Sequence, residues 1–138
     1  MRRLGSALLS GALLASCTTA PEPAQRSADR QRELQMLLAG KTAGPPVSCL
    51  PNYNSNDMRI IDGRNVAFRL GGRSVYLMHL SPGCDLLGSG NYALLTKQFG
   101  GMGYCRGDIV RVFDPTSRNT VGSCGIDEIV PYTSPGRY

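Results

Sequence analysis

The chain has 138 residues, a formal net charge of +5 at pH 7, five cysteines and no tryptophan. The basic excess is small, and the arginines of its globular part lie singly, without a basic run: Arg59, Arg64, Arg69, Arg73, Arg106, Arg111 and Arg118. Nucleic-acid-binding proteins usually concentrate their cations in runs or patches, so the composition argues against a nucleic-acid partner.

Residues 1–16 have the organisation of a bacterial signal peptide. Two arginines stand near the start, and the apolar run Leu4–Ala15 is short for a bilayer-spanning helix, which needs about 20 residues. The segment Leu14-Ala15-Ser16-Cys17 then resembles the lipobox at which bacterial lipoprotein precursors are lipidated and cut. The alternative is cleavage after Ala20, which would place Pro21 just after the scissile bond, where its fixed φ fits a protease groove poorly.

The lipobox resemblance implies that Cys17 becomes the first residue of the mature protein and carries acyl chains, palmitate among them. Each buried CH₂ contributes about 0.8 kcal/mol, so several chains attach a protein to a membrane essentially permanently. Thr18, and not aspartate, follows the cysteine, which by lipoprotein sorting rules favours the outer membrane, facing the periplasm. Loss of residues 1–16 leaves 13 basic and ten acidic residues, a net charge of +3. We therefore expect a lipid-anchored cell-envelope protein.

A tether and a helix are expected next. Residues 17–26 contain no large apolar side chain and are predicted to form a flexible tether. A short helix is predicted over residues 27–40, where three leucines recur at helical spacing: Leu34, Leu37 and Leu38. A helix of about 12 residues is marginal alone, so this stripe should dock. Docking on the chain's own β domain is favoured over docking in a partner's groove.

Alternating apolar residues then predict strands joined by two turns, Asp62-Gly63-Arg64 and Gly71-Gly72. A three-residue loop at the first turn sets Ile60 opposite Val66. A two-residue loop at the second sets Val66 opposite Leu77. Both turns return the apolar residues to one face, as a meander covering a single core requires.

The second half continues this pattern less regularly. Strands are predicted over Tyr92–Leu95 and Asp108–Phe113, and the latter is apolar on both faces, which suggests a buried position. Asp114-Pro115 begins a turn, and Thr120–Cys124 returns as the partner strand. The segment around Ile126 is left open between a closing strand and a single helical turn.

Five to seven short strands therefore predict a mainly β fold. We expect a small antiparallel barrel or sandwich, a β-meander with one short N-terminal helix, stapled by disulfides over residues 41–133. Residues 134–138 are expected to be a disordered tail.

Four cysteines remain once Cys17 is assigned to lipid: Cys49, Cys84, Cys105 and Cys124. An even number in an oxidising compartment predicts two disulfides, which a domain of about 90 residues needs because it buries little surface. Three pairings are open. A hairpin centred on Asp114-Pro115 places Cys105 diagonal to Cys124, which favours that pair and, by elimination, Cys49 with Cys84. A zinc site is disfavoured because no Cys-x-x-Cys pair is present, and we expect no metal.

No catalytic constellation is recognisable. The single histidine, His79, is placed opposite Arg64, where a positive charge would lower its pKa and make it a poor base, so a structural role is favoured. Ser81 and Asp85 are near it only in sequence. Asp127 and Glu128 are adjacent, so on a strand they would point to opposite faces and could not form a carboxylate dyad; a solvated pair is favoured. We predict no catalytic residue and no enzyme.

Two further motifs have ordinary interpretations. Arg106-Gly107-Asp108 spells a tripeptide known from integrin ligands, but three residues match by chance, and these are expected to shape the start of a strand. Gly100-Gly101-Met102-Gly103 lacks the lysine and serine or threonine of a phosphate-binding loop, so no cofactor is expected.

Four segments together resemble an uncharacterised family of small secreted or lipid-anchored proteins of Gram-negative bacteria: Ala43–Leu50, Tyr76–Cys84, Cys105–Ile109 and Cys124–Ile129. The resemblance supports the fold and the location, and it implies no site residue. The expected function is a non-enzymatic binding or structural module whose partner is an envelope protein or a cell-wall component. The alternative is a small periplasmic inhibitor or envelope-stress sensor, similar in design to lipoprotein lysozyme inhibitors, with the loop Phe99–Tyr104 beside Lys97 as its plug.

Overall fold

A computed structural model describes residues 28–51, 57–96 and 103–136. It confirms a mainly β protein with one short helix. The elements are α1 (Ala28–Leu38), β1 (Thr42–Ala43), β2 (Met58–Ile60), β3 (Asn65–Leu70), β4 (Ser74–Leu80), a short 3₁₀ helix η2 (Asp85–Ser89), β5 (Ala93–Thr96), β6 (Ile109–Asp114) and β7 (Asn119–Thr133). The predicted helix and the predicted strands are therefore present, with boundaries that differ by a few residues.

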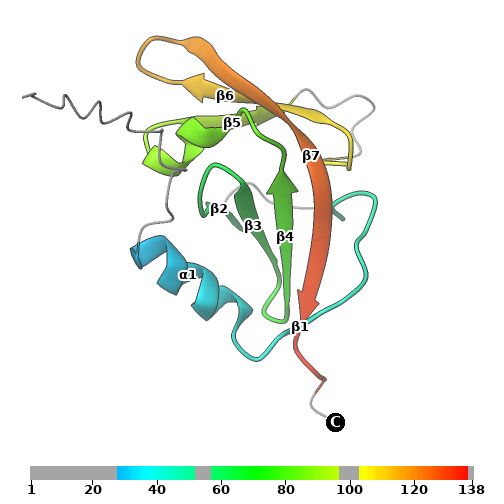
Figure 1. Cartoon of the computed structure of the whole chain (residues 1–138). Helices are drawn as coiled ribbons and strands as arrows, with labels where there is room; N and C mark the ends of the chain where they lie inside the picture. Colours follow the sequence, from blue (N-terminus) through cyan, green and yellow to red (C-terminus); the bar gives the residue numbers. More distant parts are fainter. Residues whose placement is uncertain (1–27, 52–56, 97–102, 137–138) are drawn as a thin grey trace, which may run out of the picture.

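The strands form one curled antiparallel sheet in the order β2-β3-β4-β7-β6-β5 (Figure 1). Strand β7 has 15 residues and belongs to both halves of the sheet. Its first half pairs with β6, from Asp114↔Asn119 to Ile109↔Gly125, and its second half pairs with β4 and β1. The segment around Ile126, for which the sequence allowed either a closing strand or a helical turn, therefore lies in the middle of β7, the longest strand.

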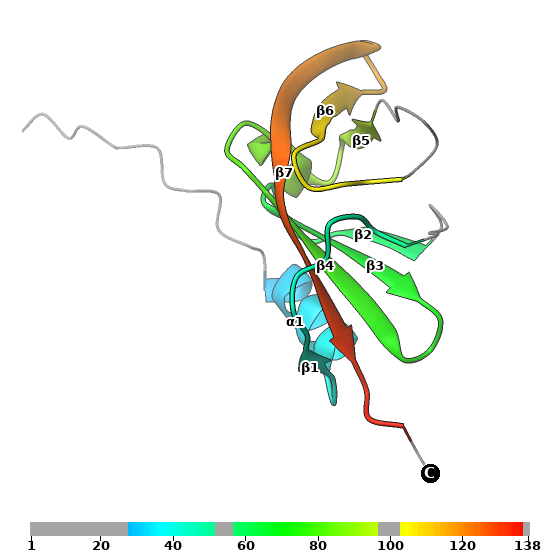
Figure 2. The same ribbon diagram turned by 90° about the vertical axis from the view of Figure 1, so that its right-hand side faces the viewer.

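Two irregularities mark where β7 curves. The register shifts at Leu80, where Asp127 is the extra residue of β7, and again at Phe113, where Val121 is the extra residue. An extra residue in one strand bends it and increases its twist. Figure 2 shows the result, with β5 and β6 standing over β2 and β3 and β7 running through both layers as a half-barrel.

The main core fills the inside of this half-barrel. Its fully buried side chains come from both layers: Val66, Phe68, Met78, Leu87, Val110, Val112 and Ile129. Leu50 and Tyr104, which lie in the segments before β2 and before β6, also belong to this core, and the ring of Tyr104 lies 5.4 Å from that of Phe68. A tilted pair at this distance is a favourable aromatic contact.

A second, smaller core lies on the other face of β3 and β4, under α1 (Figure 1). Leu34 is buried there against Ala67, Val75 and Leu77. The helix therefore docks on the chain's own β domain, as the leucine spacing predicted.

The first hairpin has the predicted register, and the second does not. Ile60 pairs with Val66. The β3–β4 loop, however, has three residues, so Val66 pairs with Met78 and not with Leu77. A slip of one residue moves every side chain to the opposite face. Val75 and Leu77 therefore contact the helix, while Met78 faces the half-barrel.

The cysteines form two disulfides, but the favoured pairing is wrong. The bonds join Cys49 to Cys105 and Cys84 to Cys124, so they cross in sequence. The β6–β7 ladder ends at Gly107, whose N–H donates to the carbonyl of Ile126. Because the chain turns immediately before this point, Cys105 is carried away from β7 and forms a bridge with Cys49.

The other disulfide depends on a close backbone crossing. Gly83, with φ of +115°, lies against the carbonyl of Ser123, and a Cβ there would overlap that oxygen. A Cβ on Gly122 would stand 2.7 Å from the carbonyl oxygen of Gly83. Two glycines thus let the segment before η2 approach β7 closely enough for Cys84 to reach Cys124.

The disulfide pairing is testable by a non-reducing tryptic map, because the four cysteines fall in four different peptides: 42–59, 74–97, 98–106 and 119–137. We expect 42–59 linked to 98–106 and 74–97 linked to 119–137 in the mass spectrum. Linkage of 42–59 to 74–97 would contradict the structure.

Gly83→Ala should lower the free energy of unfolding by about 3 kcal/mol, since backbone strain and overlap each cost on the order of 1–3 kcal/mol. Gly71→Ala is the matched control: Gly71 also has a positive φ, +70°, but no atom lies within 4 Å of its added Cβ. Urea unfolding should therefore show a smaller loss for the control, about 1 kcal/mol. Equal losses would mean that the close crossing is not tight in solution.

Candidate functional site

Two of the sites predicted from the sequence fall outside the described residues. One is the lipidation site Cys17, and the other is the expected plug, because Lys97 and most of the loop Phe99–Tyr104 are not described. Tyr104 itself is described and is buried in the main core against Phe68, so its ring is not exposed to a target. Within the described ranges, no helix is both long and apolar enough to cross a membrane.

His79 belongs to a small polar cluster at the first hairpin turn. Its Nδ1 lies 2.8 Å from Oδ1 of Asn65, whose amide nitrogen donates to the carboxylate of Asp62 at 2.9 Å. Since Oδ1 of Asn65 only accepts, Nδ1 of His79 carries a proton. The sequence predicted that His79 lies opposite Arg64. This prediction is wrong by one register position, because His79 pairs with Asn65. These hydrogen bonds tie the His79 side chain to the first hairpin turn.

The other polar residues singled out in the sequence also hold the backbone. Ser81 Oγ accepts from the N–H of Gly125 at 2.7 Å, and Asp108 Oδ2 accepts from the N–H of Cys105 at 2.9 Å. Gly107 has φ of +90°, so the tripeptide that contains it forms the turn before β6, as expected. Across the described parts of the chain, no three His, Cys, Asp or Glu side chains are grouped for a metal ion.

The outer face of the β5–β6–β7 sheet exposes apolar side chains on three adjacent strands. Leu95 is 45% exposed, Ile109 60% and Val121 40%. Arg111 lies between them, directly opposite Leu95 on one side and Ser123 on the other. We call these four residues, Leu95, Ile109, Arg111 and Val121, the outer patch.

The charge at the centre of the outer patch is uncompensated. In the described ranges, the Arg111 side chain has neither a hydrogen bond nor an ion pair. An arginine flanked by apolar side chains on a rigid sheet is a combination that protein interfaces favour. The outer patch is therefore the candidate interaction surface of the described residues.

Sequence reasoning missed this surface because it predicted that the β6 strand is buried on both faces. Val110 and Val112 are buried, but Ile109 is the most exposed of the three apolar residues of the outer patch. Arg111 could have revealed this surface. It lies between Ile109 and Phe113 on the same face of β6, and a charged residue there indicates that this face is exposed to solvent.

A family of unknown function (DUF6491) matches residues 1–135. No curated protein and no solved structure matches the chain. Since the matched region covers almost the entire sequence, the chain belongs to this family of unknown function.

Proposed function

We propose that this protein is a lipid-anchored module of the bacterial cell envelope that binds a partner protein through the outer patch and catalyses no reaction. The observation that carries the proposal is the outer patch, whose apolar residues on three neighbouring strands surround an arginine that has no ion pair within the described residues. The lipobox at Leu14–Cys17 supports the anchoring, and Thr18 supports the outer membrane.

The residue types of the outer patch indicate which kind of partner surface would fit it. Apolar side chains on a partner would cover Leu95, Ile109 and Val121, and the charge of Arg111 requires a carboxylate opposite it. A hydrogen-bonded arginine–carboxylate pair within an apolar surround is strong and directional. We therefore propose a partner protein that presents an acidic side chain within an apolar surface.

The tether restricts where this partner lies. If Cys17 is acylated, residues 18–27 separate the anchor from α1, and ten extended residues span at most about 35 Å. Binding would then occur close to the membrane, so a partner in the envelope fits the proposal. The proposal that the protein catalyses no reaction is supported by three polar residues, since their side chains hydrogen-bond to other parts of the fold: His79, Ser81 and Asp108.

Arg111→Glu should strongly weaken partner binding, because it places a carboxylate against the partner's carboxylate and like charges at an interface cost several kcal/mol. Affinity capture from solubilised envelopes should recover one dominant protein with the wild type and at least about tenfold less with Arg111→Glu, a difference of 1.4 kcal/mol or more. The matched control is Arg106→Glu, which makes the same charge change at an exposed residue outside the patch.

Two results would contradict the proposal. One is equal loss of capture in both variants, which would assign the effect to net charge. The other is a purified wild type that dimerises in analytical ultracentrifugation while Arg111→Glu is monomeric, because the patch would then bind a second copy of the chain.

A further inference from the structure

Residues of α1 and of the β3–β4 hairpin line a groove of about 340 Å³. In Figure 1, α1 and this hairpin lie at the other end of the molecule from β5 and β6, which carry most of the outer patch. The lining of the groove comes from the helix, the segment after it, the residue before β2 and the hairpin: Met36, Leu37, Lys41, Asp57, Arg69, Gly71, Gly72 and Val75. Small-molecule sites have volumes of about 300–1,000 Å³, so the groove suits a small ligand.

Part of the groove lining is apolar, and the groove is accessible to solvent on one side. Val75 is buried and Leu37 is half-buried, and both belong to the contacts between helix and sheet. Met36 is 72% exposed at the mouth. No atom lies within 4 Å of the position where Gly72 would carry a Cβ, so the loop leaves this side accessible.

The charged part of the lining has an excess of cations. Lys41 and Arg69 each carry a positive charge, and neither has a hydrogen bond or ion pair from its side chain in the described ranges. Asp57, which precedes the Met58–Phe68 pair, also lines the groove, but it forms no ion pair with Arg69. Two cations therefore face one carboxylate.

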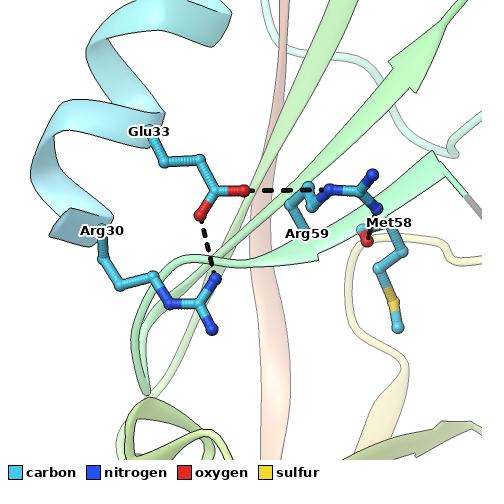
Figure 3. Close-up of polar contacts among 4 residues, drawn as sticks. All are labelled: Arg30, Glu33, Met58 and Arg59. Atoms are coloured by element: carbon cyan, nitrogen blue, oxygen red, sulfur yellow. Dashed lines mark hydrogen bonds and ion pairs between the residues drawn. The ribbon is translucent and has the colours of Figure 1, made fainter.

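The carboxylate of Glu33, on the same helix, is already engaged. It binds Nη1 of Arg30 at 2.9 Å and lies 3.8 Å from Nε of Arg59, as Figure 3 shows. Arg59 in turn donates from Nη1 to the carbonyl oxygen of Met58 at 2.9 Å. This network fixes Glu33 beside other cations, so the positive charge of the groove remains available to a ligand.

We propose that the groove is a binding site for an oxyanion, a carboxylate or a phosphate ester, that carries a short apolar group. The Arg69 guanidinium and the Lys41 ammonium bind the oxyanion, and Leu37 and Val75 contact the apolar group. A guanidinium donates two parallel hydrogen bonds to either kind of oxyanion. The site is separate from the outer patch and does not depend on partner binding there.

Titration of the full chain in a neutral detergent, followed by amide NMR, tests the proposal with four probes: butyrate, butyl phosphate, inorganic phosphate and butanol. We expect butyrate or butyl phosphate to shift the resonances of Gly71 and Gly72, inorganic phosphate to bind more weakly, and butanol to leave them unchanged. Binding of butyl phosphate alone would assign the ligand to phosphate esters, and binding of butyrate alone to carboxylates.

The variants locate the site. Arg69→Ala and Lys41→Ala should each weaken binding of the anionic probe by about tenfold, the loss of one charge-assisted contact. Arg106→Ala, which removes the same charge from an exposed residue elsewhere, should leave the affinity within about twofold of the wild type. Arg69 is exposed, so its removal should not unfold the protein, and the spectrum itself reports the fold. No shift with any anion, equal shifts with butanol, or equal weakening by Arg106→Ala would overturn the proposal.

Discussion

Strand β7 is the constraint on which the rest of the structure depends. Its backbone pairs with β6 over its first half and with β4 over its second, so one strand supplies the ladder for both layers of the half-barrel. The two extra residues, Val121 and Asp127, bend it where the sheet must turn. A straight strand of this length would give a flat sheet, and its two layers could not enclose a core.

The disulfides reinforce this arrangement because they cross. Cys84–Cys124 holds the segment before η2 against β7, and Cys49–Cys105 joins the segment between β1 and β2 to the segment before β6. The two loops have sequence separations of 40 and 56 residues, which in the chain-entropy model corresponds to about 4 kcal/mol of stabilisation each. This is comparable with the whole net stability of a small domain, about 5–15 kcal/mol.

Local patterns predicted the local structure well. The leucine spacing located α1, and the Asp62-Gly63-Arg64 turn gave the correct first hairpin because turn length and apolar alternation agreed there. The second hairpin failed because Arg73 belongs to the loop, and both faces of β4 are apolar, so alternation alone could not choose between the two registers. The disulfide pairing failed for a related reason, since the turn before β6 is visible only in the backbone hydrogen bonds around Cys105.

The two surfaces proposed for binding lay beyond sequence reasoning because each depends on tertiary packing. The outer patch exists because no element of the described chain covers the outer face around Arg111. The groove exists because α1 docks beside the β3–β4 hairpin and brings Lys41 to the same side as Arg69. The patch and the groove belong to opposite layers of the half-barrel, so a module displayed from a membrane would offer a partner and a small anion separate places to bind.

The proposed place of action depends on anchoring of the protein to a membrane through Cys17. The most direct measurement is the intact mass of the protein extracted from the membrane fraction of its native host. We expect a chain that lacks residues 1–16 and carries acyl groups on Cys17. A retained Met1, or an unmodified Cys17, would contradict lipid anchoring and with it the proposed place of action.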